Sequence, residues 1–308
     1  MTNFILIILC VAIGMAMSRA KILPAGSHKA INAWVLYLAL PAFSLRFIPE
    51  IEWSVKLLLP IAGALTVWIG AWLFVQLYDR KKRLSVASHT ALLVTCGLGN
   101  TAFLGLPMTA AFYGESEIHH AIIFDQVTFL LFATIGVIVV LRASAKHAGT
   151  ANATPLHILV VKKIFRFPPF IGCLCALILP QFMDISIANP LLDKLIATMS
   201  PMALFSIGLQ LKFGEVKQEW HLLSAGLFYK LLLAPCLVLA LTLAMHAGGN
   251  LAKISVFEAG MSPHITASLL VSQYNLNPRY CSLVVGLGIM FGFATSTIWY
   301  FVLQRAVG

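Results

Sequence analysis

The sequence predicts an all-α integral membrane protein of about ten transmembrane helices, built as two inverted five-helix repeats in which helices 4 and 9 are broken. The first observation is composition: 60% of the 308 residues are hydrophobic and only 10% are charged, whereas soluble domains carry about 25% charged residues. A soluble domain of this size could not bury so much apolar surface. The composition therefore excludes a soluble globular protein and a disordered chain.

The second observation is the run of apolar stretches along the chain. A helix needs about 20 apolar residues to cross a bilayer, and short polar connections separate stretches of this length throughout the sequence. The ten expected spans are 3–19, 29–47, 55–78, 88–113, 119–141, 167–183, 189–211, 220–246, 250–274 and 279–304.

The distribution of basic residues predicts the orientation. The formal net charge is +10, and most Lys and Arg residues lie in the loops that follow the first, third, fifth, seventh and ninth expected spans. Short loops rich in Lys and Arg stay in the cytoplasm, so both the N- and the C-terminus are expected outside. The basic residues are not interleaved with aromatic residues as in a nucleic-acid surface, and no nucleic-acid partner is expected.

The third observation is an internal repeat. A polar stretch at 143–163, expected to be a cytoplasmic linker, divides the chain into residues 1–142 and 164–308. The two halves echo one another in order, as Gly97–Asn100 matches Gly260–Pro263. Since each half has an odd number of expected spans, the second half enters the bilayer inverted relative to the first. Inverted repeats are typical of transporters.

The fourth and ninth expected spans carry helix-breaking residues near their centres. Irregular backbone at this depth is tolerated only inside protein or beside a water-filled cavity. Two broken helices in matching positions point to a binding site at the midplane, where freed amide donors attract an anion. Alternatively, Gly and Pro are simply commoner in membrane helices. The expected breaking residues are Gly97, Gly99, Pro107, Gly260 and Pro263.

Polar residues beside the two breaks are the candidate substrate-binding residues: Asn100, Thr101, Ser262 and His264. An unwound Asn100 could donate to a carboxylate or cap the half-helix that follows. His264 could contact the ligand or take part in proton movement. The alternative for His264 is a neutral ring that bonds to a carbonyl.

Charged residues within the spans form a second candidate group, because a buried charge costs at least ~2.5 kcal/mol in a membrane helix. Asp125 could carry a proton or pair with a neighbouring basic group. Glu258 and Lys230 lie on adjacent spans and are predicted to form an ion pair; otherwise Glu258 faces a cavity and Lys230 extends to the interface. With His264, these three residues are the candidates for ion or proton coupling.

The stretch Asn100–Gly114 (Asn-Thr-Ala-Phe-Leu-Gly-Leu-Pro-Met-Thr-Ala-Ala-Phe-Tyr-Gly) resembles a motif of the auxin efflux carrier family, which includes the plant PIN-formed carriers. The ninth span, with Pro263 and Gln273–Pro278, is similar to the second repeat of that family. The likeness covers nearly the whole chain in span order. Gly99 stands where plant members often have Pro, and their long polar loop is reduced here to 143–163, which resembles a prokaryotic member.

The resemblance implies an elevator-type secondary transporter of small organic anions, carboxylates such as malate and malonate or auxin-like acids. It implies a homodimer in the bacterial inner membrane, without a cofactor or a bound metal. The anion would be held between the ends of the crossing helices. The scaffold would comprise residues 1–50 and 164–212, and the mobile transport part residues 54–142 and 219–308.

Two other classes remain as alternatives. One is a sodium- or proton-coupled symporter or antiporter that resembles the bile-acid symporters, although such sites usually carry carboxylates at the crossing itself. The remote alternative is an intramembrane enzyme or a receptor. The spans contain no zinc-binding pattern, nucleophile elbow or paired catalytic carboxylates, and no phosphate-binding Gly-rich loop occurs in the sequence. An enzyme is therefore not expected.

Overall fold

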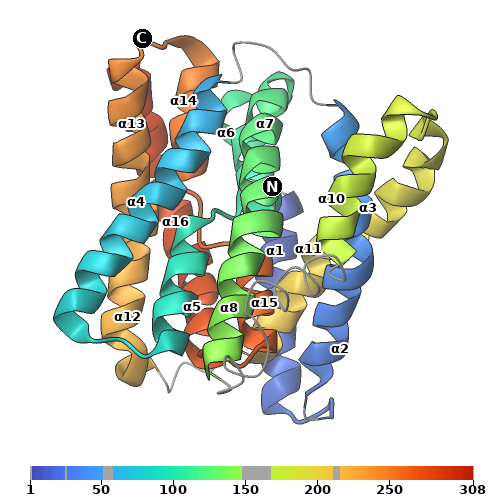
Figure 1. Ribbon diagram of the computed structural model, residues 1–308, viewed down its shortest axis with the longest axis vertical. Helices are drawn as coiled ribbons and strands as arrows, with labels where there is room; N and C mark the ends of the chain where they lie inside the picture. The colour runs from blue at the N-terminus through green and yellow to red at the C-terminus, as the bar shows by residue number, and fades with distance from the viewer. Residues whose placement is uncertain (1, 25, 51–57, 148–167, 211–215, 308) are drawn as a thin grey trace.

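The computed structural model describes residues 2–24, 26–50, 58–147, 168–210 and 216–307. Within these ranges the chain is almost entirely helical (Figure 1). The described residues form no β-strand, and their extended pairing is limited to an isolated bridge between Gly99 and Pro263. The expected linker at 143–163 begins inside helix α8, Val137–His147, and its remainder lies outside the described residues.

The helices form two groups that lie beside one another in Figure 1. The first group consists of α1 (Thr2–Arg19), α2 (Ser27–Trp34), α3 (Leu40–Phe47), α10 (Pro168–Ile178) and α11 (Asn189–Gln210). The second group consists of α4 (Leu58–Lys82), α5 (Val86–Gly97), α6 (Leu106–Tyr113), α7 (Ile118–Leu131), α8, α12 (Val216–Phe228), α13 (Ala234–Ala244), α14 (Gly249–Ala259), α15 (Ile265–Gln273) and α16 (Pro278–Ala306). Short 3₁₀ turns occur at η2 (Ile48–Glu50), η5 (Glu115–Glu117), η8 (Leu179–Gln181) and η9 (Ser186–Ala188).

Several long helices contain a π-helical turn, a feature that often marks a functional position. One joins α2 to α3, one precedes α6, one joins α7 to α8, and one joins α12 to α13. These turns are η1 (Val35–Ala39), η4 (Thr101–Gly105), η6 (Phe132–Gly136) and η11 (Tyr229–Leu233).

Six described helical stretches are long and apolar enough to cross a bilayer: Ser27–Glu50, Leu58–Lys82, His120–His147, Ser186–Leu209, Val216–Ala244 and Pro278–Ala306. The fourth and ninth expected spans are absent from this set because each is divided into two short helices. The first and sixth expected spans correspond to α1 and to the short α10. The total of ten spans and the inverted symmetry therefore stay predictions.

One end of the second group carries a cluster of basic residues. Helix α4 ends with Arg80, Lys81 and Lys82, and in Figure 1 this end lies at the edge opposite the C-terminal end of α16. The predicted orientation places the basic loop after α4 in the cytoplasm and the C-terminus outside. It therefore requires the two to lie at opposite edges of the molecule. Which edge faces the cytoplasm stays a prediction.

The first group is held by close contacts between small residues, as is common where membrane helices cross. Helix α1 runs along α11, and a Cβ placed on Gly208 would lie 3.0 Å from the Cα of Gly14. Buried polar contacts add to this packing, because the Ser206 hydroxyl donates to the Asn32 side-chain oxygen. These helices therefore form a compact unit next to the larger group that contains the broken helices.

Candidate functional site

Both broken helices stop near the middle of the second group. Helix α5 ends at Gly97 and η4 begins at Thr101, so that Gly99 lies outside the helices. Helix α14 ends at Ala259 and α15 begins at Ile265, with Gly260 and Pro263 between them. Pro263 has no amide hydrogen and disfavours a helical residue before it, which explains why the second interruption is the longer one.

Pro107 does not break the helix, and this expectation was wrong. It occupies the first turn of α6, where the missing amide hydrogen of proline has no cost. The wider π turn η4 lies directly before it.

The two interruptions contact one another through their backbones. Gly99 and Pro263 form an isolated antiparallel bridge. The amide of Asn100 donates to the Ser262 carbonyl at 2.8 Å, and its side-chain amide donates to the Ser262 hydroxyl at 3.3 Å. These contacts join the two halves of the chain, because the paired residues Asn100 and Ser262 are 162 positions apart in sequence. We call this contact, formed by residues 98–100 and 260–264, the helix crossing.

The predicted binding residues are all buried here, but they play different parts. Asn100 and Ser262 touch one another, whereas the Thr101 hydroxyl turns away and donates to Asp125 at 2.5 Å. His264 Nδ1 accepts from the amide of Ala267 at 3.2 Å and so caps α15. A ring nitrogen that accepts carries no hydrogen. The alternative for His264 was a neutral ring that bonds to a carbonyl. The partner of Nδ1 is instead the backbone amide of Ala267.

Lys230 reaches the helix crossing from η11. Its ammonium donates to the Ala259 carbonyl at 2.8 Å, and a Cβ placed on Gly99 would lie 3.0 Å from its Nζ. Ala259 is the last residue of α14, so the ammonium satisfies one of the carbonyls that a helix end leaves free and complements the negative end of the helix dipole.

The predicted ion pair between Glu258 and Lys230 is wrong. Ion pairs between described residues do not include it. Glu258 instead accepts from the Thr109 hydroxyl at 2.8 Å. The carbonyl of Ala259 points along the axis beyond the end of α14, whereas the side chain of Glu258 projects outward from the helix, so the two groups meet different neighbours. The two charges therefore share the same buried region without direct contact.

Asp125 has a hydrogen-bond donor for each of its oxygens. Thr101 donates to one, and the Gln126 side chain donates to the other at 3.3 Å. The alternative, that Asp125 pairs with a basic group, is not observed, because the ion pairs between described residues do not include Asp125.

Sequence reasoning missed the residues that contact the Glu258 carboxylate, Thr109 and Gly105. Thr109 was not singled out, because threonine in an apolar helix usually bonds to its own backbone. Gly105 was noted only as part of a motif, yet the Glu258 carboxylate packs so closely on it that a methyl group there would collide with Oε2. The spacing offered one signal, since Gly105 and Thr109 lie four residues apart on one helix face.

Several buried polar atoms near the helix crossing have no hydrogen-bond partner in the described structure. They include Asn100 Oδ1, Gln126 Oε1, Glu258 Oε2 and the Thr266 hydroxyl. Native proteins leave few such atoms, and each calls for an explanation such as a ligand, a water molecule or a proton. The described residues contain no group of three His, Cys, Asp or Glu side chains that could hold a metal ion.

Comparison with known proteins identifies the family. Residues 1–300 match the family described as membrane transport protein. The chain belongs to this family, that of the auxin efflux carriers. An uncharacterized transporter of Methanothermobacter thermautotrophicus is 22% identical over 303 residues, 96% of each chain. A second uncharacterized transporter, from Methanocaldococcus jannaschii, is 22% identical over 326 residues, 97% of each chain. The chain is thus a multi-pass membrane transporter.

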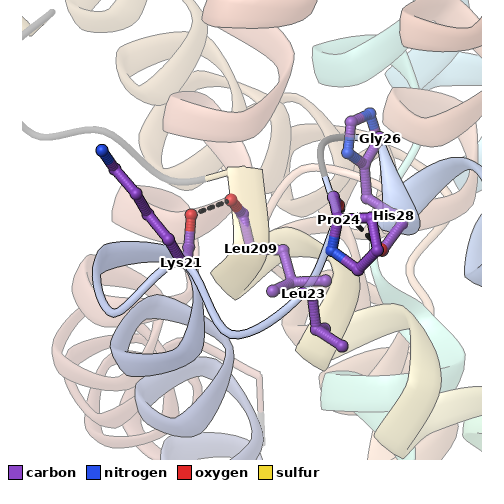
Figure 2. Close-up of a pocket in the computed structure, with 8 residues that line it drawn as sticks. Lys21, Leu23, Pro24, Gly26, His28 and Leu209 are labelled. Atoms are coloured by element: carbon purple, nitrogen blue, oxygen red, sulfur yellow. Dashed lines mark hydrogen bonds between the residues drawn. The ribbon is translucent and has the colours of Figure 1, made fainter.

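A separate pocket of about 370 Å³ lies in the first group of helices (Figure 2). It is lined by Ser18, Lys21, Leu23, Pro24, Gly26, Ser27, His28 and Leu209. The Ser18 hydroxyl donates to the Leu209 carbonyl at 2.9 Å, and Ser27 donates to Pro24 at 2.8 Å. Both hydroxyls are thus engaged with the backbone. The pocket belongs to helices other than those of the helix crossing, so we do not assign the transported substrate to it.

Proposed function

We propose that this membrane transport protein is a secondary transporter of small organic anions, and that the anion binds at the helix crossing. The observation that carries the proposal is the backbone bridge between Gly99 and Pro263, which brings the two interrupted helices into contact inside the second group. Unwound backbone in a membrane protein needs partners other than its own helix, and a carboxylate ligand supplies strong acceptors.

The electrostatics of the helix crossing support an anion. η4 begins at Thr101 and α15 at Ile265, so both half-helices have their N-termini here. The first amides of a helix have no partner within it and carry partial positive charge. The ammonium of Lys230 adds a full positive charge beside the same bridge. A bound carboxylate would accept hydrogen bonds from these groups and from the Asn100 side chain.

The two groups of helices support an elevator-type mechanism. α1 packs along α11 and α10 packs along α3, so the first group is held mainly by contacts within itself. We take it as the scaffold, and the second group, which contains the helix crossing, as the mobile transport part. Carriage of the whole crossing past the scaffold would expose the bound anion to each side in turn. We further propose a homodimer in the bacterial inner membrane, as the family resemblance implies, with both chain ends outside, as the distribution of basic loops predicts.

Counterflow in proteoliposomes tests the proposal. Vesicles loaded with unlabelled malate, malonate or indole-3-acetate should take up the labelled form of the same acid. Asn100→Ala should reduce the exchange rate or affinity by roughly 10- to 100-fold, because a hydrogen bond to a charged group contributes about 1.5–3 kcal/mol. Asn250→Ala is the matched control, since Asn250 is exposed near the start of α14. Normal exchange by Asn100→Ala, or no exchange of any acid by the wild type, would contradict the proposal.

A further inference from the structure

Two buried carboxylates contact the same π turn, one at each end. Asp125 accepts from Thr101, the first residue of η4, and the Glu258 carboxylate packs on Gly105, its last residue. Both carboxylates are buried: Asp125 is 3% exposed and Glu258 0%. They lie beside the first half-helix of the helix crossing, where the proposed anion binds.

The two carboxylates differ in their hydrogen bonds. Both oxygens of Asp125 receive a donor, from Thr101 and from Gln126. Glu258 receives one donor, from Thr109 to Oε1, and its Oε2 has no partner in the described structure. A buried oxygen without a donor is far more costly in the ionised form than in the neutral form. The hydrogen bonds therefore support an ionised Asp125 and a protonated Glu258.

The balance of charge leads to the same assignment. The charged groups of this buried region are Lys230, Asp125 and Glu258, with one positive and two negative charges when all are ionised. Other titratable groups nearby are the hydroxyls of Tyr113 and Tyr300, from α6 and α16, and the capping ring of His264. An incoming carboxylate would meet a surplus negative charge in a region of low dielectric constant. A proton on one carboxylate removes this surplus.

We propose that the protein couples a proton to the anion and that Oε2 of Glu258 carries the proton; this rests on the function proposed above. The O–H bond forms when the carboxylate takes a proton from water on the side to which the site is open. It breaks when that proton is returned to water on the opposite side. Because linkage is reciprocal, protonation of Glu258 strengthens anion binding, and the bound anion strengthens protonation. Thr109 positions the carboxylate through Oε1.

The packing around Oε2 favours a proton over a sodium ion. The space between Oε2 and the backbone of Gly105 does not admit a methyl group, and a coordinated cation needs several oxygen ligands around it. A proton adds almost no volume. Sodium coupling, the alternative suggested by the likeness to bile-acid symporters, is thus the competing outcome in the experiment.

The experiment measures protons and malate in the same proteoliposomes. A trapped pH-sensitive dye reports acidification of the lumen when malate is added outside, and labelled malate reports exchange. For the wild type we expect malate to acidify the lumen and an inwardly directed pH gradient to accumulate malate, with or without sodium. For Glu258→Gln we expect malate exchange without proton movement, so that the acidification of the lumen falls to that of protein-free vesicles whatever the exchange rate.

Matched variants make the result specific to Glu258. Glu219→Gln changes a partly exposed carboxylate on α12 that accepts from Asn277, and it should keep the wild-type ratio of protons to malate. Asp125→Asn should also keep the ratio, even if its exchange is slower. If Glu258→Gln does not fold, the infrared carboxylic-acid band of the wild type provides the second measurement. That band should be present in the wild type and should shift in Glu258→Asp, because the shorter side chain changes the hydrogen bond that Thr109 donates to the carboxyl group.

The possible outcomes separate the two proposals. Malate exchange without proton movement in the wild type, accumulation driven by sodium instead of pH, or loss of the proton ratio in Asp125→Asn alone would overturn the inference and leave the proposed transport function in place. Absence of exchange for every acid would overturn the transport function, and the inference with it. The absence of a carboxylic-acid band in the wild type would overturn the assignment of the proton to Glu258.

Discussion

Lys230→Met should lower malate counterflow by one to two orders of magnitude, since a hydrogen bond between the ammonium and the bound anion contributes about 1.5–3 kcal/mol. The ammonium bonds to the Ala259 carbonyl at 2.8 Å and lies against the bridge residue Gly99. Methionine fills a similar volume but neither satisfies the end of α14 nor offers positive charge to an anion. The measurement is the initial rate of exchange per folded protein in proteoliposomes.

The fold itself should survive this change. The partner that Lys230→Met leaves behind is the uncharged Ala259 carbonyl, not an unpaired buried charge, so the variant should elute as the wild type does in size-exclusion chromatography. Lys253→Met is the matched control, because Lys253 lies on α14 and bonds to Gln304 at a distance from the helix crossing. Exchange by Lys230→Met at the rate of Lys253→Met would show that the ammonium is not needed for transport.

The location of the interruptions was predictable from sequence because it depends on local backbone chemistry. Gly99 and Pro263 weaken a helix wherever they occur, and both lie outside helices in the structure. Pro107 was misjudged for a local reason as well. A proline in the first turn of a helix is compatible with it, and the sequence does not state where a helix restarts.

The contacts of the charged side chains were not predictable in the same way. Lys230 lies within the π turn η11, where the extra residue rotates every later side chain relative to a regular helix. Adjacent spans, on which the predicted pair with Glu258 rested, do not fix the direction of a side chain, and Lys230 meets the carbonyl of Ala259 instead. Thr109 illustrates the second difficulty, because its hydroxyl leaves its own helix for a carboxylate that is 149 residues away in sequence.

A valine at Gly208 should lower the stability of the protein by about 1–3 kcal/mol, the usual cost of overfilling a well-packed site. The cost should lie at the upper end here, because a Cβ on Gly208 would lie 3.0 Å from the backbone of Gly14 on α1. Backbone atoms cannot move aside as a flexible side chain can. The measurement is the midpoint of thermal unfolding in detergent, compared with Ala12→Val, which places the same valine side chain at an exposed position of α1.

The paired glycines also predict a particular deviation from additivity. Gly14 and Gly208 face one another across the α1–α11 contact, and each Cβ would approach the Cα of the other at 3.0 Å. The first substitution must push the two helices apart, and the second then enters space that has already been opened. Gly14→Ala with Gly208→Ala should therefore cost less than the sum of the single changes, as coupled neighbours do. If the loss in free energy of unfolding of the double variant equals the sum of the two single losses, the two helices do not move apart together. Each methyl group is then accommodated by shifts of its immediate neighbours.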